Sequence, residues 1–309
     1  MTARRPACIT AGRTASPTGE EQMFNQKIQY PLRLSPVFLL TRLVGRLARY
    51  EGRRLTRWAI ILFIRLYRVN MQEALRPKPE QYRTFNDFFP RELVPGSRPI
   101  DRHPHSMVFP ADGFTCEYDP VQDEHFFQAK GQRYSLHSLL ASHGYLTRLF
   151  SQGCFFNIYL PPGAYHRVHM PCDGMLREMI YVPGTFYSVR PSMVKNVPGI
   201  FASNERIICI FDTPFGSMAQ ILLGAKIVGS IETVWLREIN SPGHRSGGCQ
   251  IWHYPAEGDE SIRLKKIMGL FRMGSAVIDL FSSDKVRLES SLSGYREVRQ
   301  GQKMATVNV

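Results

Sequence analysis

The sequence predicts an α+β protein in which N-terminal amphipathic helices precede a β-rich, mainly antiparallel core. Its 309 residues are 43% hydrophobic, which suits a packed core. Apolar residues recur at helical spacing before residue 68, whereas short β-branched and aromatic runs follow residue 100. We therefore expect a disordered extension at 1–24, a helical region at 25–100 and a β-rich core at 101–309.

The helical region is predicted to begin with two amphipathic helices. Ser35 and Pro36 form a helix start, because serine caps a helix and proline is tolerated in its first turn. Leucines follow at helical spacing until the helix ends near Gly52. A second helix is predicted from about Arg54 to Tyr67, and a short helix capped by Thr84 comes later.

Positive charge is concentrated in the same region. The chain has 39 Lys and Arg against 26 Asp and Glu, and its net charge of +13 favours polyanions such as anionic lipid or nucleic acid. Residues 33–68 hold nine arginines and the single acid Glu51. These helices can lie at a membrane interface, or they can pack on the core with a solvated basic face. The residues alone leave both interpretations open.

Composition argues against several other classes of protein. No run approaches the roughly 20 apolar residues of a membrane span, and Arg65 closes the longest run in the basic region. The six cysteines form no CxxC pair, which argues against a disulfide framework or a structural zinc site and indicates reduced thiols. Residues 1–22 lack the apolar core of a secretory signal, and Glu20 and Glu21 favour a start at Met23 over a targeting extension.

The β-rich core is predicted from six short segments. Each is rich in β-branched or aromatic residues, and Gly or Pro lies near most of their ends. No repeat of 20–50 residues is apparent, which argues against a repeat array. The predicted strands are 154–160, 175–182, 206–211, 230–236, 249–254 and 276–281.

Four segments contain residue types that can carry chemistry. Asp112 lies in FPADG, although most Asp-Gly pairs are only turns. His166 and His169 are three residues apart in YHRVHMPCDG, and an extended chain would point them to opposite faces, which argues against a shared metal ion. A polar cluster, NER at 204–206, interrupts buried strands, and the dipeptide at 274–275 precedes an apolar strand. Taken singly, each has an ordinary structural explanation.

Taken together, these segments resemble phosphatidylserine decarboxylase proenzymes of the bacterial type. The motifs YHRVHMPCDG, NER, LGAKIVGSIETVW and MGSAVIDLF occur in this order. The segments RTFNDFFPREL, FPADG and QAKGQRYSLHSLL extend the resemblance over roughly residues 25–300. The set is highly specific, because its last motif matches the site at which this family cuts its own chain.

The resemblance implies roles for four residues. Asp112, His169 and Ser275 match the family's self-cleavage triad, and His166 matches a residue that positions substrate or transfers protons. In such a triad the imidazole takes the serine proton and the carboxylate orients the imidazole. No metal ligand set is expected.

Cleavage is expected between Gly274 and Ser275. Attack of the serine on the glycine carbonyl would give an ester, whose elimination and hydrolysis leave a β chain of 1–274 and an α chain of 275–309. Ser275 then becomes a covalent pyruvoyl group, which forms a Schiff base with the amine of the substrate and accepts electrons as carbon dioxide leaves. Ala276 replaces the threonine usual after the cleavage serine, a change that can slow maturation.

The expected reaction is decarboxylation of phosphatidylserine to phosphatidylethanolamine and CO2. The expected partners are phosphatidylserine in an anionic membrane and a second copy of the cleaved heterodimer, with the enzyme peripheral on the cytoplasmic side of the cell membrane. Nucleic acid is not expected, because arginines interleaved with aliphatic helical faces fit lipid better. One alternative is a relative that binds anionic lipid without decarboxylating it. Another is a pyruvoyl enzyme for a soluble amino acid, against which the amphipathic helices argue.

Overall fold

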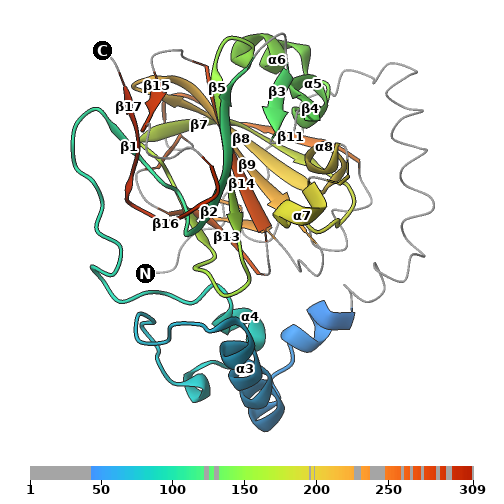
Figure 1. Cartoon of the computed structure of the whole chain (residues 1–309), viewed down its shortest axis with the longest axis vertical. Coiled ribbons are helices and arrows are strands. Elements are labelled where there is room, and N and C mark those ends of the chain that lie inside the picture. Colours follow the sequence, from blue (N-terminus) through green and yellow to red (C-terminus); the bar gives the residue numbers. More distant parts are fainter. Residues whose placement is uncertain are drawn as a thin grey trace.

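A computed structural model shows a helical end joined to a larger β-rich body (Figure 1). The structure describes residues 43–121, 125–128, 132–194, 196–197, 199–225, 231–236, 248–258, 261–264, 267–272, 275–282, 286–289 and 294–307. This arrangement confirms the predicted α+β class with N-terminal helices and a mainly antiparallel core. The predicted extension at 1–24 lies outside the described residues.

The helical end is built around α3 (Arg53–Tyr67), which confirms the second predicted helix to within one residue. Residues 43–48 are also helical, and the predicted start of that first helix at Ser35 lies outside the described residues. Gly52 caps α3, so the first helix ends a few residues earlier than expected. No helix in the described residues is both long and apolar enough to cross a membrane.

A small apolar cluster attaches α3 to the chain that follows it. Ile60 of α3 is fully buried with Val69, Tyr82 and Phe88. The helices η1 (Pro79–Gln81) and α4 (Phe85–Phe88) follow α3. The hydroxyl of Thr84 accepts a hydrogen bond from the amide of Asp87, which confirms the predicted cap of α4.

The β-rich body is dominated by one antiparallel sheet, which has nine strands in the described part of the chain. Eight strands form a continuous path, and the ninth, β12 (Ile262–Leu264), pairs with β7. In spatial order the path runs β11 (Gln250–His253), β7 (Gly174–Val182), β8 (Arg206–Thr213), β9 (Gly216–Gly224), β14 (Ser275–Phe281), β5 (Cys154–Leu160), β2 (Gly113–Pro120) and β16 (Arg296–Val298).

Smaller elements cover the two faces of this sheet. Three further sheets are formed among the described residues: β1 (Ser106–Val108), β17 (Lys303–Val307) and β15 (Val286–Leu288); β10 (Ile231–Thr233), β13 (Ile267–Phe271) and β6 (Arg167–His169); and β3 (His125–Gln128) with β4 (Gln132–Ser135). The first two sheets share an apolar core with one face of the large sheet. The helices are α5 (Leu136–Leu139), α6 (Gly144–Phe150), α7 (Pro191–Val194) and α8 (Ile200–Ser203), and they pack on the other face.

Burial on both faces explains why the central strands are mostly apolar. In β14, Val277 and Phe281 enter the core shared with the small sheets, whereas Ile278 and Leu280 enter the core under the helices. Adjacent residues of a strand point to opposite faces, so a strand covered on both sides needs apolar residues at nearly every position. This pattern made the central strands predictable from sequence.

One strand is shorter than the sequence predicted. Segment 230–236 was predicted as extended throughout, but β10 includes only Ile231–Thr233. The hydroxyl of Thr233 accepts a hydrogen bond from the amide of Leu236, which folds the chain back into a turn. Residue 230 lies outside the described residues.

Candidate active site

The predicted cleavage position lies at the start of a central strand. Ser275 is the first residue of β14 and is paired in register with Leu160 of β5 on one side and Gly224 of β9 on the other. Upstream, the amide of Phe271 donates to the carbonyl of His166 at 3.0 Å. The backbone before the cleavage position is therefore attached to the histidine motif. Gly274 lies outside the described residues.

Asp112 is buried in a cluster of ion pairs. The Nε atom of Arg98 donates to both of its carboxylate oxygens, at 2.9 and 3.0 Å, and the amide of Gln300 donates to Oδ1 at 2.9 Å. Arg98 also forms an ion pair with Glu73 at 2.9 Å. Burial lowers the pKa of Arg98, but contacts with the two carboxylates outweigh this effect and raise it. The arginine therefore stays charged and fixes the Asp112 carboxylate.

The glycine after Asp112 is required by packing rather than by a turn. A Cβ atom on Gly113 would lie 2.2 Å from the carbonyl oxygen of Tyr159. Gly113 begins β2, which pairs directly with β5 at this point. The close approach of these backbones therefore places Asp112 beside the end of β5.

His169 lies near Asp112 without a hydrogen bond to it. Its amide donates to the carbonyl of Pro110 at 2.8 Å, and its Nε2 atom is 3.1 Å from the hydroxyl oxygen of Tyr165. Burial and the charge of Arg167 lower the pKa of His169 to about 4, with Asp112 acting in the opposite direction. The imidazole is therefore neutral at physiological pH. Among the described residues, the carboxylate of Asp112 is bound by Arg98 rather than by His169.

His166 is fully buried, and its side chain contacts different residues from those around His169. Its Nδ1 atom is 2.9 Å from the carbonyl oxygen of Ala164, and its ring centroid is 4.2 Å from that of Phe89. A carbonyl oxygen only accepts, so Nδ1 carries the proton and Nε2 has a free lone pair. This Nε2 atom is buried without a hydrogen-bond partner among the described residues. Burial lowers the pKa of His166 to about 3, which keeps the ring neutral.

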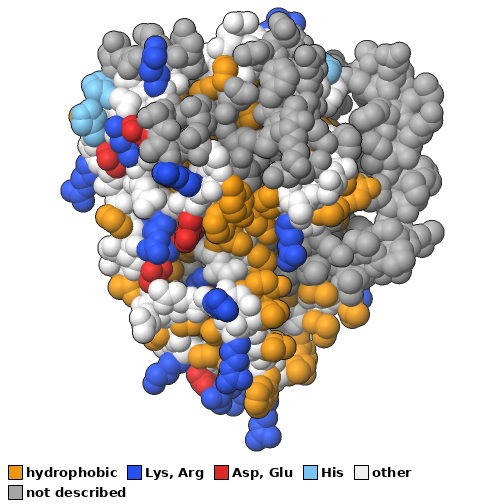
Figure 2. Space-filling view, in the orientation of Figure 1, with side chains coloured by type: hydrophobic (Ala, Val, Ile, Leu, Met, Phe, Trp, Pro, Cys, Tyr) orange, Lys and Arg blue, Asp and Glu red, His pale blue; other side chains and the backbone are white. Residues whose placement is uncertain are grey.

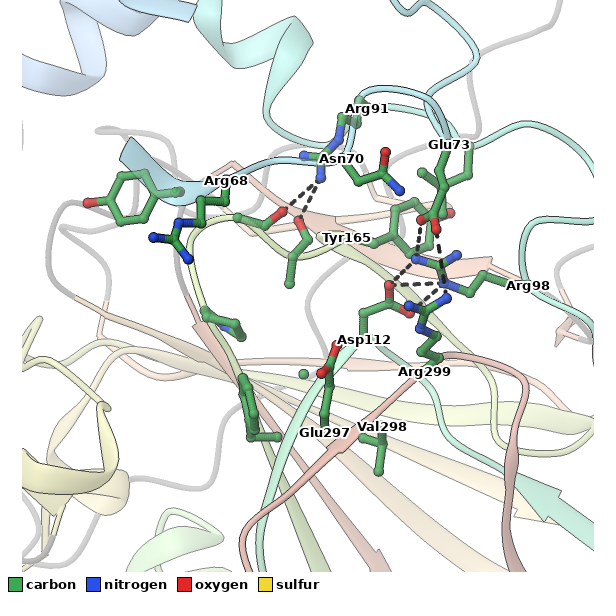
Figure 3. Close-up of a pocket in the computed structure, with 17 residues that line it drawn as sticks. Arg68, Asn70, Glu73, Arg91, Arg98, Asp112, Tyr165, Glu297, Val298 and Arg299 are labelled. Carbon is green, nitrogen blue, oxygen red and sulfur yellow. Dashed lines mark hydrogen bonds and ion pairs between the residues drawn. The ribbon is translucent and has the colours of Figure 1, made fainter. Parts of the chain in front are cut away.

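A cavity of about 280 Å³ opens between the end of α3 and these residues. Arg68 and Asn70 line it from the helical end, and Asp112 and Tyr165 line it from the β-rich body (Figure 3). Pro161, also on its wall, directly follows Leu160, the register partner of Ser275. The cavity is thus adjacent along β5 to the cleavage position.

The polar cluster at 204–206 has a structural role. The side-chain amide of Asn204 donates to the carbonyl oxygens of Tyr187 and Gly224 at 2.8 and 2.9 Å. The guanidinium of Arg206 donates to carbonyl oxygens of the α5 and α8 regions, and Glu205 accepts from the hydroxyl of Tyr181. These bonds fix the end of β9 at the residue paired with Ser275.

Sequence patterns did not identify several residues around the site. Arg98 and Glu73 lie in no chemical motif, and their link to Asp112 depends on long-range packing. Tyr165 was visible as a polar neighbour of the histidines, but its contact with His169 was not predicted. Among the described residues, no group of three or more His, Cys, Asp or Glu side chains could hold a metal ion.

Comparison with known proteins shows matches along most of the chain. A family model described as phosphatidylserine decarboxylase matches residues 85–306, and a second, described as PSD, matches residues 29–68. Phosphatidylserine decarboxylase proenzyme from Dickeya dadantii is 50% identical over 274 residues, which cover 88% of this chain and 90% of the relative. The proenzyme from Pectobacterium atrosepticum is 49% identical over 284 residues, or 91% of this chain and 82% of the relative. A proenzyme from Escherichia coli is 48% identical over 285 residues, which cover 91% of this chain and 87% of the relative.

These matches and the fold define a class of enzyme, the decarboxylases of phospholipid biosynthesis that are made as proenzymes. The chain belongs to the phosphatidylserine decarboxylase family. Family membership was predicted from the motifs and is confirmed by these comparisons.

Proposed function

We propose that the chain cuts itself between Gly274 and Ser275, converts Ser275 into a pyruvoyl group and then decarboxylates phosphatidylserine to phosphatidylethanolamine. One observation carries the proposal. Three distant segments meet at the start of β14: Leu160 pairs with Ser275, the carbonyl of His166 binds the segment before it, and the amide of His169 binds the segment of Asp112. These backbone contacts join the segments that contain Asp112, His166 and His169 to the strands beside Ser275, which supports a role for these residues in activating a serine.

His169 would act as the base in self-cleavage. With its pKa at about 4, the ring is neutral and its lone pair can accept the proton of the Ser275 hydroxyl. The lowered pKa makes the ring a weak base, and approach of the Asp112 carboxylate would raise that pKa. Burial raises the pKa of Tyr165 to about 12, so this hydroxyl keeps its proton and can donate it to Nε2 of His169. When Tyr165 donates, the imidazole proton is on Nδ1, the tautomer that a carboxylate such as Asp112 would stabilise. The Ser275 hydroxyl would replace Tyr165 at Nε2 before its proton is transferred. Movement of Asp112 from Arg98 toward His169 would complete the triad.

The surroundings of Ser275 fit a covalent pyruvoyl group made from it. The position is flanked on both sides by sheet strands, and the buried Nε2 of His166 has no partner among the described residues. A pyruvoyl group supplies an electron sink that stabilises the negative charge left as carbon dioxide departs. His166 would accept a proton at Nε2 from the substrate, while its bond to Ala164 holds the ring in place. The cavity beside Asp112 would admit the lipid headgroup.

The helical end would place the enzyme on an anionic membrane. Figure 2 shows hydrophobic and basic side chains together at this end of the molecule. Along α3, Leu55, Trp58, Leu62 and Leu66 are 64–68% exposed, an unusual state for large apolar residues. Aliphatic and aromatic side chains beside arginines are typical of helices that lie in the headgroup region. Attachment at the cytoplasmic side and a homodimer of the cleaved enzyme stay predictions from the family resemblance.

The test is the intact mass of the purified protein under denaturing conditions, with and without borohydride. We expect two chains, of which the smaller contains residues 275–309 and has a reducible carbonyl in place of the serine amine. The Ser275→Ala variant should be uncut and should not release carbon dioxide from phosphatidylserine. Turnover by this uncut variant would refute the pyruvoyl assignment. A single uncut wild-type chain that binds lipid without turnover would instead favour the lipid-binding alternative.

A further inference from the structure

Four arginines line the cavity beside Asp112, and they differ in what they contact. Arg98 binds Asp112 and Glu73, and Arg299 lies 3.7 Å from Glu73. Arg91 is 4% exposed and donates to the carbonyl oxygen of Gly163 at 2.8 Å. Arg68, at the end of α3, is exposed and has no ion-pair partner among the described residues. Arg91 also forms no ion pair among the described residues, and its Nε and Nη1 atoms have no hydrogen-bond partner there, but this side chain is enclosed. Arg68 is therefore the exposed cation of the cavity lining that is available to an external anion.

The charge of the cavity lining fits one phosphodiester. The lining holds four arginines and three carboxylates, which leaves one positive charge uncompensated. A phosphatidylserine headgroup has a phosphate, a carboxylate and an ammonium group, and its net charge is therefore one negative. Guanidinium groups bind phosphate oxygens through two parallel hydrogen bonds, so the free cation matches the anion that a lipid headgroup presents.

The backbone of Arg68 gives a second, independent indication. Arg68 caps the C-terminus of α3 in the left-handed region, with φ 51° and ψ 45°. Glycine is the usual residue at this position, because a side chain there is strained. Strained residues cluster at ligand sites, where the surrounding structure holds them in place. The chain thus has an arginine where helix termination alone would favour glycine.

The position of Arg68 relative to the core is fixed by a close contact. A Cβ atom on Gly163 would lie 2.7 Å from the carbonyl oxygen of Tyr67, so the loop after β5 packs directly on the end of α3. Arg91 holds the same loop through Gly163 and Ala164. In Figure 3, Arg68 lies on the wall of the cavity beside this loop. Arg68 thus lines the cavity at the junction of the exposed apolar helix and the β-rich body.

We infer that Arg68 binds the phosphodiester of the lipid substrate and so positions its headgroup in the cavity. The inference rests on the proposed function, because it assigns a binding residue for that substrate. The alternative is that Arg68 only balances the negative end of the α3 dipole, as Arg65 in the last turn of α3 can also do.

The experiment separates these roles by replacing Arg68 with glycine. Glycine removes the guanidinium but relieves the backbone, so Arg68→Gly should unfold at a midpoint temperature no lower than that of wild type. Binding is measured by calorimetry with dihexanoyl phosphatidylglycerol below its micelle concentration, since this lipid has the phosphodiester but no amine and forms no surface. The dissociation constant should rise about 10-fold or more, the loss expected for one charge-assisted hydrogen bond.

The matched control is Arg65→Ala, which removes a positive charge one turn earlier on α3, away from the cavity lining. Its dissociation constant should stay within about twofold of wild type. Equal weakening by both variants, or no weakening by Arg68→Gly, would overturn the inference. The inference would also be overturned if Arg68→Gly weakened the binding of inorganic phosphate but not the binding of the diester. If Arg68→Gly did not fold, Arg68→Asn would replace it, because asparagine tolerates the same backbone region.

The outcomes also separate this inference from the proposed function. If wild type were uncut and inactive but its binding of the diester depended on Arg68, the phosphate site would stand and the proposed function would fail. If wild type were cut and active while Arg68→Gly bound the diester normally, only the assignment of Arg68 would fail. In the mature enzyme, the KM for dihexanoyl phosphatidylserine should rise in parallel with the dissociation constant.

Discussion

Asp279 is a buried acid whose replacement should stabilise the protein in a pH-dependent way. It lies on β14, four residues after Ser275, is fully buried and faces Gln220 of β9 and Phe156 of β5 in register. Neither carboxyl oxygen has a hydrogen-bond partner among the described residues. Burial raises the pKa of Asp279 from 3.8 to about 7, and the nearby side chain of Gln220 offsets this only in part.

The size of the expected stability change follows from this pKa. The folded state holds this proton more tightly than the unfolded state, so the contribution of Asp279 to the free energy of unfolding is most favourable below pH 3.8 and is lost as the pH rises to 7. A shift of about three pKa units corresponds to about 4 kcal/mol at 1.36 kcal/mol per unit. Asn has nearly the same shape and does not ionise. The variant Asp279→Asn should therefore gain up to about 4 kcal/mol over its parent at pH 8, but much less at pH 5.

The assay is urea unfolding at pH 5 and pH 8, carried out in the uncut Ser275→Ala background so that a single chain unfolds. We expect the stability difference between Asp279→Asn and its parent to grow by about 3 kcal/mol between the two pH values. The exposed Asp212, which pairs with Arg177, provides the control Asp212→Asn for the loss of one carboxylate. A difference that is the same at both pH values would falsify the assignment of a buried proton to Asp279.

Three further predictions concern the site and its surroundings. His169→Ala should leave the protein folded but block the appearance of the small chain in denaturing gels, and normal cutting would remove His169 as the base. Replacing Trp58 and Leu62 with glutamate should weaken sedimentation with anionic vesicles while self-cleavage proceeds, whereas unchanged sedimentation would exclude α3 as the membrane contact. Gly113→Ala should cost about 1–3 kcal/mol in denaturant unfolding, because its methyl group would collide with the backbone of Tyr159, and wild-type stability would contradict the close packing of β2 on β5.

Sequence alone identified elements whose pattern is set by local rules or by burial on both faces. The helix Arg53–Tyr67 and the cap at Thr84 were predicted because helix spacing and capping act over a few residues. The strands Cys154–Leu160 and Arg206–Thr213 were predicted, the second as 206–211, because most of their residues are β-branched, aromatic or otherwise apolar. Segment 230–236 was partly wrong, since a single threonine hydroxyl ends the strand by a bond that composition does not reveal.

The motif residues of the candidate site were predictable from the sequence, but the residues that contact them were not. Asp112 and His169 were found because they belong to recognisable motifs. The bond from the amide of Gln300 to Asp112 joins residues 188 positions apart, and no local pattern encodes such a contact. The exposed side chain and left-handed backbone of Arg68 were likewise invisible, because both depend on how α3 ends against the core.

The placement of β14 has a consequence for the protein after the proposed cut before Ser275. Each of the residues Ser275–Phe281 is paired with β5 on one side and with β9 on the other, and both neighbours belong to the larger chain. Removing the small chain would expose two unpaired edges in the middle of the sheet and take apolar side chains out of both cores. Under the proposed cleavage, separation of the two chains would therefore be the same event as unfolding. The cut protein should then behave in solution as a single cooperative unit, and its new chain end would be held between two strands of the larger chain.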